Sequence, residues 1–297
     1  MDLMMYGAPK MAGFGESVFC ESYAYIPGGK GANQAVAAAK LGADVAMVGR
    51  LGDDENGRAL IENLERSGVD TTGVVHDPKR QTGLAAITVD RDSGKYICYV
   101  AIGANDWIEP RQVERALCLR NYDMVLMQLE MPLETVYRSY ELAGERGIPV
   151  FLDAGPAMNI PLDRLKGIFI LSPNEAETEA LTGISTASPE GVISAAKSLF
   201  SRVDPKYVLL KLGARGALLY DGQAPEWIPC FDRIDVVDTT AAGDTFGAAF
   251  AVRYIGNGDV RDAVRYAHAA AGVCVSRKGA QSSMPSVGEV ESFLSGR

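Results

Sequence analysis

Short apolar runs alternate with helical patterns along most of this chain, and the alternation limits the folds it can adopt. Residues 44–49 are predicted to form a buried strand, followed by a helix through residues 59–64. Further apolar runs occupy residues 123–127, 149–152, 167–171 and 207–210. Strands separated by helical patterns form parallel sheets with crossover helices. The sequence therefore predicts an α/β fold with parallel strands.

Polar residues and a glycine directly follow several of these runs. Glu130, Asp153, Asn174 and Gly213 each come just after a predicted strand. Ligands of parallel sheets collect at the carboxyl ends of the strands, which meet at one edge. We therefore expect these four residues to share one rim of the sheet.

One region breaks the alternation. Residues 82–89 and 95–101 are predicted strands joined by the polar loop Asp90-Arg91-Asp92-Ser93-Gly94, and residues 18–26 could add another strand. A plain surface hairpin is the simplest interpretation. The apolar residues 84–87 and 96–100 disfavour it, because a solitary exposed hairpin would leave them in water.

Composition narrows the class of protein. The 297 residues, 47% of them hydrophobic, suffice for one large α/β domain with an appendage. No apolar run approaches membrane-spanning length, so no membrane segment is expected. A net charge of −9 disfavours a nucleic-acid partner, which requires a basic face. The cysteines lack zinc or CxxC spacing and residues 1–6 lack a signal-peptide pattern, so a reducing cytoplasmic location is expected.

The segment Asp238-Thr239-Thr240-Ala241-Ala242-Gly243-Asp244-Thr245-Phe246 places a carboxylate behind a loop of small residues that opens a helix. The small side chains allow backbone N–H groups to face a ligand, and the helix adds its positive dipole end. An anion hole beside a base is what phosphoryl transfer to a hydroxyl requires. A capped helix start without a ligand is the alternative.

A second glycine-rich element is Gly28-Gly29-Lys30-Gly31-Ala32-Asn33-Gln34, which leads into a helix of small residues. Its glycines allow close approach of a ligand, and Asn33 offers both a donor and an acceptor to a polyol. A tight turn before a closely packed helix is the alternative. The element is not a P-loop, because Lys30 is followed by Gly31 and not by Ser or Thr.

Histidine is scarce, since the chain contains only His76 and His268. A Ser-His-Asp relay or a multi-histidine metal site is therefore disfavoured. A general base would be a carboxylate, which again favours Asp244.

Together these segments resemble the ribokinase branch of the pfkB family of carbohydrate kinases. Residues 28–34 match the first family signature, and residues 238–246 match the second. Other family segments follow in the expected order: Met127-Gln128-Leu129-Glu130, Ser172-Pro173-Asn174-Glu175-Ala176-Glu177, Lys211-Leu212-Gly213-Ala214-Arg215-Gly216 and Arg277-Lys278-Gly279-Ala280-Gln281. The resemblance extends from about Asp2 to the C-terminus.

The resemblance implies a three-layer α/β/α sandwich with a mainly parallel sheet and a small β-sheet lid. Residues 1–28 and 81–104 would form the lid, and residues 29–80 and 105–297 the kinase core. The implied reaction is ATP-dependent phosphorylation of D-ribose at its O5 hydroxyl to D-ribose 5-phosphate and ADP. Asp244 would be the general base, and backbone groups at Ala242, Gly243 and Asp244 would hold the developing charge. The lid would also pair with a partner's lid in a homodimer.

The resemblance also implies the other site residues. The sugar would be bound by Asp2, Gly29, Lys30, Asn33, Glu130 and Asp244. The ATP side would comprise Asn174, Glu177, Lys211, Leu212, Gly213, Ala214, Arg215, Gly216, Gly243 and His268, with Asn174 and Glu177 organising Mg²⁺ through water. A K⁺ activator would lie at Asp238, Thr240, Cys274, Arg277, Gly279 and Ser283, held mostly by backbone carbonyls. Lys30 could instead only solvate its loop, and His268 could only pack within its helix.

The chain departs from the family at its front. Related chains begin with an apolar strand and a Ser-Ile-Asn-Met-Asp-like turn, of which only the last two residues remain, as Met1-Asp2. We therefore expect a central strand to be missing, two neighbouring strands to lose a partner, and Asp2 to lie on a frayed end. Either the start is placed too far downstream or the protein is genuinely shortened.

Other functions stay open at this point. The chain could be another pfkB-family sugar or nucleoside kinase, acting on deoxyribose, fructose or ketodeoxygluconate; the ribose assignment depends on residues 28–34 and Glu130. It could also be a weakly active or inactive sugar-binding homologue, although Asn33, Gly243 and Asp244 are retained. An NAD-dependent dehydrogenase is disfavoured, because no Gly-x-Gly-x-x-Gly follows an early strand.

Overall fold

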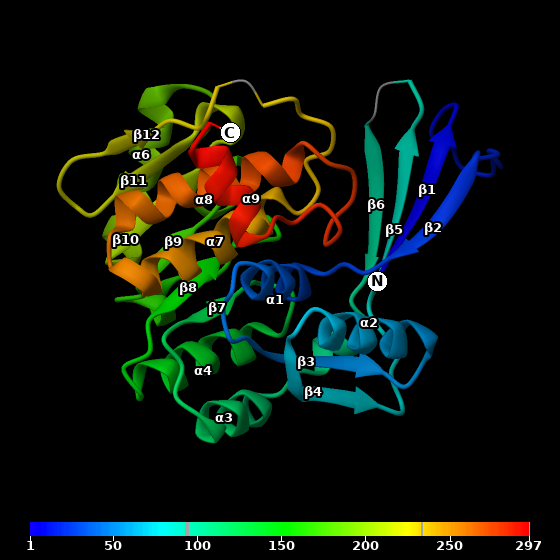
Figure 1. The fold of residues 1–297 in the computed structure, drawn as a ribbon, viewed down its shortest axis with the longest axis horizontal. Coiled ribbons are helices and arrows are strands. Elements are labelled where there is room, and N and C mark those ends of the chain that lie inside the picture. Colours follow the sequence, from blue (N-terminus) through cyan, green and yellow to red (C-terminus); the bar gives the residue numbers. More distant parts are fainter. Residues whose placement is uncertain (93–94, 233, 297) are drawn as a thin grey trace.

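The computed structural model describes residues 1–92, 95–232 and 234–296, and Figure 1 shows a body of sheet and helices with a separate β-sheet beside it. Ser93 and Gly94 of the predicted hairpin loop lie outside the described residues. The strands are β1 (Asp2–Ala8), β2 (Ser22–Ile26), β3 (Ala46–Gly52), β4 (Asp70–Asp77), β5 (Leu84–Asp90), β6 (Tyr96–Ala101), β7 (Val125–Met127), β8 (Val150–Asp153), β9 (Ile170–Ser172), β10 (Tyr207–Lys211), β11 (Ala217–Tyr220) and β12 (Glu226–Ile228).

Helices separate β3 from β4, β6 from β7, β7 from β8 and β9 from β10, as the predicted alternation requires. In the described residues β4 to β6 and β10 to β12 follow one another without an α-helix. The α-helices are α1 (Lys30–Lys40), α2 (Glu55–Arg66), α3 (Pro110–Leu119), α4 (Leu133–Gly144), α5 (Glu175–Thr182), α6 (Pro189–Val203), α7 (Ala242–Asn257), α8 (Val260–Val275) and α9 (Val287–Leu294). Short 3₁₀ turns are η1 (Gly103–Trp107), η2 (Asp163–Leu165) and η3 (Gly213–Arg215).

The main sheet has the order β12-β11-β10-β9-β8-β7. Strands β7 to β10 are parallel, and β11 and β12 continue the sheet antiparallel. Successive side chains alternate between its faces: Phe151 and Leu209 belong to the core with α7 and α8, whereas Leu152 and Leu210 belong to the core with α4 and α6. Helices therefore cover both faces, which confirms the three-layer α/β/α architecture.

Helix α7 is enclosed by protein, and its small residues make this possible. Residues 244–251 are all buried, and α7 packs against both α1 and α8. A Cβ added to Gly247 would lie 3.2 Å from the Phe151 ring, so the helix lies tightly on the sheet. The alanine-rich α1 allows an equally close approach on the other side. The start of α7 thus lies deep in the molecule.

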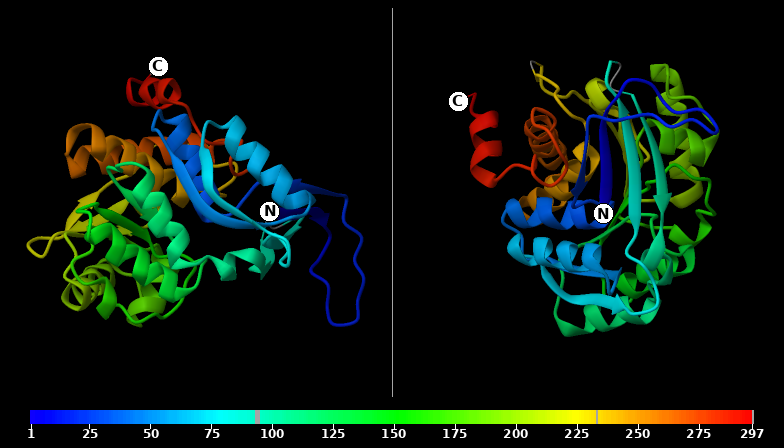
Figure 2. Two further views of the ribbon diagram at one scale, coloured as in Figure 1. Left: turned by 90° about the horizontal axis from the view of Figure 1, so that it is seen from below. Right: turned by 90° about the vertical axis from the view of Figure 1, so that its right-hand side faces the viewer.

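The second sheet, which we call the lid sheet, has the order β2-β1-β5-β6. It stands beside the body in Figure 1, and the connection between β1 and β2 projects away from the body in Figure 2. Strands β5 and β6 form the predicted antiparallel hairpin, and β2 falls within the range predicted for a further strand. All six residues of β6 are exposed, so the apolar side chains of this strand are not covered within the chain, whereas those of β5 are half-buried.

The parallel strands of the body do not form one continuous sheet. Strands β3 and β4 pair only with each other, and no strand among the described residues lies between β3 and β7. A cavity of about 230 Å³ separates them, with a largely apolar lining that includes Val45, Met47, Val125 and Met127. Folded interiors contain few voids larger than a water molecule. The central strand that was expected to be missing therefore corresponds to a gap in the packing between β3 and β7.

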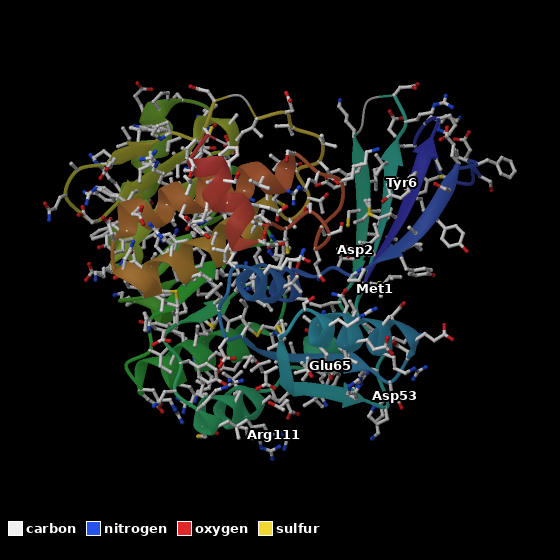
Figure 3. The ribbon with its side chains drawn as sticks, in the orientation of Figure 1. Met1, Asp2, Tyr6, Asp53, Glu65 and Arg111 are labelled. Carbon is white, nitrogen blue, oxygen red and sulfur yellow. The ribbon has the colours of Figure 1, made fainter. Side chains whose placement is uncertain are left out.

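The chain start lies close to this gap. Met1 lines a second cavity of about 130 Å³, which shares the lining residues Gly31, Met47 and Gln128 with the first. Figure 3 places Met1 and Asp2 where the lid sheet meets the body. The expectation of a frayed Asp2 is wrong. Asp2 is paired on both sides, with Ile26 and Ala85, because β1 is a central strand of the lid sheet.

An added strand that fills the gap is expected to stabilise the fold. We predict that a designed extension ahead of Met1, with five consecutive Val or Ile residues and a short polar turn, raises the free energy of unfolding by a few kcal/mol. The cavity volume sets a ceiling of about 5 kcal/mol. Urea unfolding would measure the gain, and a Gly-Ser extension of equal length is the control. Equal stability of the two extended proteins would contradict the prediction.

Candidate active site

The start of α7 presents backbone amides to a ligand. Ala241, the residue before the helix, has a φ of 60°, a left-handed conformation that is uncommon for a residue other than glycine. The amide of Ala242 donates to Thr239 O at 3.2 Å, so this residue does not offer a free donor as the sequence suggested. Among the described residues, the amides of Gly243 and Asp244 have no protein acceptor. The anion hole therefore reduces to two amides.

Asp244 is buried in the first turn of α7 and is only 5% exposed. Its Oδ2 accepts a hydrogen bond from Asn33 Nδ2 at 2.8 Å, whereas its Oδ1 has no partner. Burial raises the pKa of Asp244 to about 6, and Lys30, Asn33 and Lys211 oppose this rise. A helix start by itself favours the ionised carboxyl, but burial outweighs that effect. A carboxylate with one free oxygen and this pKa is suited to accept a proton near neutral pH.

Lys30 lies among carboxylates. Its side chain is next to Gly155 and Glu177, because a Cβ added to Gly155 would contact both. Burial alone would lower the pKa of Lys30, but the charges of Asp244, Asp153 and Glu177 raise it above its usual value. The Lys30 amide donates to Glu130 Oε2 at 3.3 Å. Lys30 is therefore a fully charged, partly buried cation beside Asp244, and it does more than solvate its loop.

A buried ion pair beneath the site was not predicted. Lys211 Nζ contacts Asp153 Oδ1, and Asp153 Oδ2 accepts from Gln34 Nε2 at 3.0 Å. A Cβ added to Gly243 would lie 3.7 Å from Lys211 Nζ, so this cation also borders the anion hole. The sequence placed Asp153 on the rim and Lys211 on the nucleotide side. Nothing in the sequence indicated that the two side chains meet.

Asp2 and Glu130 lie on the side of the site next to the lid sheet. Gly28 leaves room for Asp2, because a Cβ at Gly28 would collide with the Asp2 carboxylate. Burial raises the pKa values of Asp2 and Glu130. Gly29, with a φ of 95°, begins α1 and faces open space, since nothing lies within 4 Å of an added Cβ. These glycines and Glu130 thus border the cavity of about 130 Å³ next to the lid sheet, which Met1 also lines.

Asn174 and Glu177 form a capping box at the start of α5. Glu177 N donates to Asn174 Oδ1 at 2.9 Å, and Asn174 N donates to Glu177 Oε2 at 2.7 Å. Glu177 Oε1 remains on the Lys30 side, next to Gly155. Mg²⁺ needs few protein carboxylates, because it keeps several waters and binds phosphates. One remaining carboxylate oxygen fits the expected water-mediated role.

The loop after β10 contains two glycines with positive φ. Gly213 and Gly216 have φ values of 54° and 87°, and Leu212 N donates to Gly216 O at 2.9 Å. Leu212 is buried, and Ala214 O accepts from Cys230 Sγ at 2.9 Å. The Arg215 guanidinium contacts Glu175 and the carbonyl of Thr186, so this side chain is anchored to neighbouring loops.

His268 lies within α8 against the Phe246 ring, with centroids 5.2 Å apart. Burial lowers the pKa of His268 to about 4, and its Nε2 has no partner. The neutral imidazole is therefore packed within the helix layer, and it retains one unused polar atom.

The residues expected to hold K⁺ lie together beside the start of α7. Asp238 accepts from Thr240 Oγ1 at 2.7 Å and from Gly279 N at 2.9 Å, and so joins two loops. Cys274, fully buried, lies 3.1 Å from Ser283 Oγ. The Arg277 side chain turns away to Glu289, which leaves only its backbone on this side.

Within the described part of the chain, no helix is long and apolar enough to span a membrane. Residues 1–92, 95–232 and 234–296 also contain no cluster of three or more His, Cys, Asp or Glu that could ligate a metal ion.

The three-layer fold and the buried Asp244 at the start of α7 agree with the expected carbohydrate kinase. Comparison with known families agrees, because the model described as pfkB family carbohydrate kinase matches residues 2–287. The chain therefore belongs to the pfkB family of carbohydrate kinases.

Individual relatives cover nearly the whole chain. A ribokinase of Bacillus subtilis is 39% identical over 99% of this chain and 96% of its own length. A deoxyribokinase of Salmonella typhi is 36% identical, with the same two coverages. The structure of Arabidopsis thaliana ribokinase complexed with ribose and ATP is 34% identical, has a TM-score of 0.88, and is matched over 99% of this chain and 95% of that one.

The glycine loop offers a test of local strain. Gly216→Ala places a Cβ onto the carbonyl oxygen of Ile228 at a φ of 87°, whereas nothing lies within 4 Å of a Cβ at Gly213. We expect Gly216→Ala to lower the free energy of unfolding by about 1–3 kcal/mol, and Gly213→Ala by about 1 kcal/mol. Urea denaturation of both variants would measure the difference. An equal loss for the two would mean that the φ value alone, and not the contact with Ile228, sets the cost.

Proposed function

We propose that this chain phosphorylates D-ribose at its O5 hydroxyl with ATP, giving D-ribose 5-phosphate and ADP. The observation that carries the proposal is the unpartnered Oδ1 of the buried Asp244, next to two free helix amides. Asp244 takes the proton of the attacking hydroxyl as the O5–phosphorus bond forms and the bond to the ADP oxygen breaks. The amides of Gly243 and Asp244 stabilise charge on the transferred group. Relatives named ribokinase, one of them bound to ribose and ATP, support the substrate pair.

The sugar would lie between the lid sheet and α1. Asp2, Asn33 and Glu130 would hydrogen-bond its hydroxyls, with the backbone of Gly29 alongside. A buried carboxylate that loses its hydroxyl partner is left desolvated, so such contacts discriminate strongly between sugars.

Two lysine side chains would stabilise negative charge on the transferred phosphoryl group. Lys30 lies beside Asp244, and Lys211 borders Gly243. Asn174 and Glu177 would hold Mg²⁺ through water, and this ion would neutralise phosphate charge when bound. Residues 212–216 and His268 would form the adenosine side of the groove, in a protein that we place in the cytoplasm.

Replacement of the base is expected to abolish most turnover. Asp244→Asn keeps the shape and can still contact Asn33, but it cannot accept the proton. We expect kcat to fall by about 10²–10⁴-fold. The measurement is the release of ADP that depends on ribose. Asp221→Asn, at an exposed bend outside the proposed site, is the matched control. Unchanged turnover in Asp244→Asn would sink the assignment of the base.

Deoxyribose is the second candidate substrate, because the deoxyribokinase relative is nearly as similar as the ribokinases. A panel of ribose, deoxyribose, fructose and ketodeoxygluconate at fixed ATP separates these possibilities by kcat/KM. A preference for any other sugar replaces ribose in the proposal. Absence of turnover with the whole panel supports a sugar-binding protein without kinase activity.

A monovalent cation would act beside the anion hole. Asp238, Thr240, Cys274, Gly279 and Ser283 gather there, with the backbone of Arg277. We predict higher kcat in K⁺ than in tetramethylammonium at equal ionic strength, because the bulky ion cannot enter the loops. Equal rates in the two salts would remove the cation from the proposal.

The lid sheet, in residues 1–28 and 81–104, would also be the homodimer contact. Tyr23 is 70% exposed and Tyr99 is 73% exposed, on strands at opposite edges of the sheet. Burying such residues favours association. We predict a dimer in analytical ultracentrifugation and a monomer for Tyr99→Asp. A monomeric wild-type protein at working concentration contradicts the prediction.

A further inference from the structure

Three side-chain amides form a continuous chain that ends on Asp244. Asn63 Nδ2, on α2, donates to Gln281 Oε1 in the loop between α8 and α9. Gln281 Nε2 donates to Asn33 Oδ1 at 3.1 Å, and Asn33 Nδ2 donates to Asp244 Oδ2 at 2.8 Å. Gln281 and Asn33 are 7% and 6% exposed, so water has little access to either. Four segments far apart in the sequence thus meet in one hydrogen-bonded line.

The carboxylate of Asp244 determines which side chain donates and which accepts in each of these hydrogen bonds. An ionised carboxylate only accepts hydrogen bonds, so Asn33 must turn its NH₂ group toward Asp244. Its carbonyl oxygen then faces Gln281, which must donate. The Gln281 carbonyl oxygen then faces Asn63, which must donate in turn. A reversal anywhere would place two acceptors or two donors face to face.

We propose that Gln281 is a positioning residue of the phosphoryl-transfer site, which fixes the orientation of Asn33 so that Asp244 is held by Oδ2 and presents Oδ1 to the substrate hydroxyl. The inference rests on the proposed function and extends it to Gln281, a residue outside the proposed sugar and ATP contacts.

The backbone of Gln281 is itself anchored. Lys40 Nζ, at the end of α1, donates to the carbonyls of Gln281 at 2.9 Å and Met284 at 3.1 Å. Helix α1 therefore carries Asn33 and, through Lys40, also holds the backbone of Gln281. This keeps the two partners of the hydrogen bond from Gln281 to Asn33 aligned.

Three charged side chains that are not part of this hydrogen-bonded chain of amides face Asp244. They are Lys30 on α1, Asp153 at the end of β8 and Lys211 at the end of β10. None of these hydrogen-bonds to Gln281 or Asn63. A neutral substitution at either amide can therefore alter the orientation of Asn33 while leaving those charges in place.

A matched pair at position 63 tests the direction of the chain. Asn63→Leu removes the first donor but leaves the bond from Gln281 to Asn33 intact. In Asn63→Asp, the new acceptor draws the Gln281 NH₂ group toward itself, so that Gln281 presents its oxygen to Asn33 and reverses the line. Gln281→Met removes the middle donor without adding charge, and Gln223→Met, on an exposed turn, is the surface control.

The variants are compared by kcat and KM for ribose across pH 5–8.5, by urea unfolding, and by ¹³C NMR titration of the Asp244 carboxyl. We expect Asn63→Asp and Gln281→Met to lower kcat about tenfold with little change in the ribose KM. We expect the Asp244 pKa to rise by about half to one unit, because the ionised form loses its donor. Asn63→Leu and Gln223→Met stay near wild type.

The outcomes separate this inference from the proposed function. An unchanged Asp244 titration in both Asn63→Asp and Gln281→Met overturns the inference, whether or not the protein phosphorylates ribose. The inference is also overturned if Asn63→Asp and Asn63→Leu lose kcat equally and in proportion to their loss of stability. A merely structural role of these side chains predicts that result. A wild-type protein without kinase activity but with the expected shift in titration removes the proposed function alone.

Discussion

The carboxylate of Asp244 is buried at the start of an enclosed helix, and the surrounding structure is arranged to make that burial tolerable. A charge removed from water is costly unless hydrogen bonds and opposite charges compensate. The N-terminal turn of α7, the amide of Asn33 and the cations of Lys30 and Lys211 supply this compensation. Small residues in α1 and α7 are needed for the same reason, since they bring these groups within reach. Compensation is incomplete, and the carboxyl keeps a pKa near neutrality.

Local patterns were sufficient to predict most of the fold. The alternation of apolar runs and helical patterns indicated β3 and β7 to β10 and the crossover helices, and the hairpin of β5 and β6 followed from its turn residues. Strands β1, β4, β11 and β12 were not predicted. Strand β4 (Asp70–Asp77) carries polar residues at both ends, and β12 is three residues long, so neither shows a clear apolar period. Their pairing depends on neighbours that are distant in the sequence.

Contacts across the chain explain what the sequence could not indicate about the site. The glycine-rich segments and Asp244 were recognisable because each is a continuous run. The bond from Gln281 to Asn33 spans 248 positions, and the ion pair of Lys211 with Asp153 spans 58. The hydrogen bond from the Ala242 amide to the Thr239 carbonyl also depends on the backbone conformation of that turn. The two long-range contacts follow from the packing of segments that are distant in the sequence, and no local motif encodes them.

The void between β3 and β7 makes the native state more voluminous than a fully packed one. Unfolding eliminates internal voids, so its volume change becomes more negative as those voids grow. Hydrostatic pressure acts on that difference, and the cavity of about 230 Å³ makes this protein sensitive to compression. Water forced between the two strand edges would act first where β3 and β4 are joined to the rest of the body. A moderate pressure is thus a way to loosen the part of the molecule that contains β3 and β4.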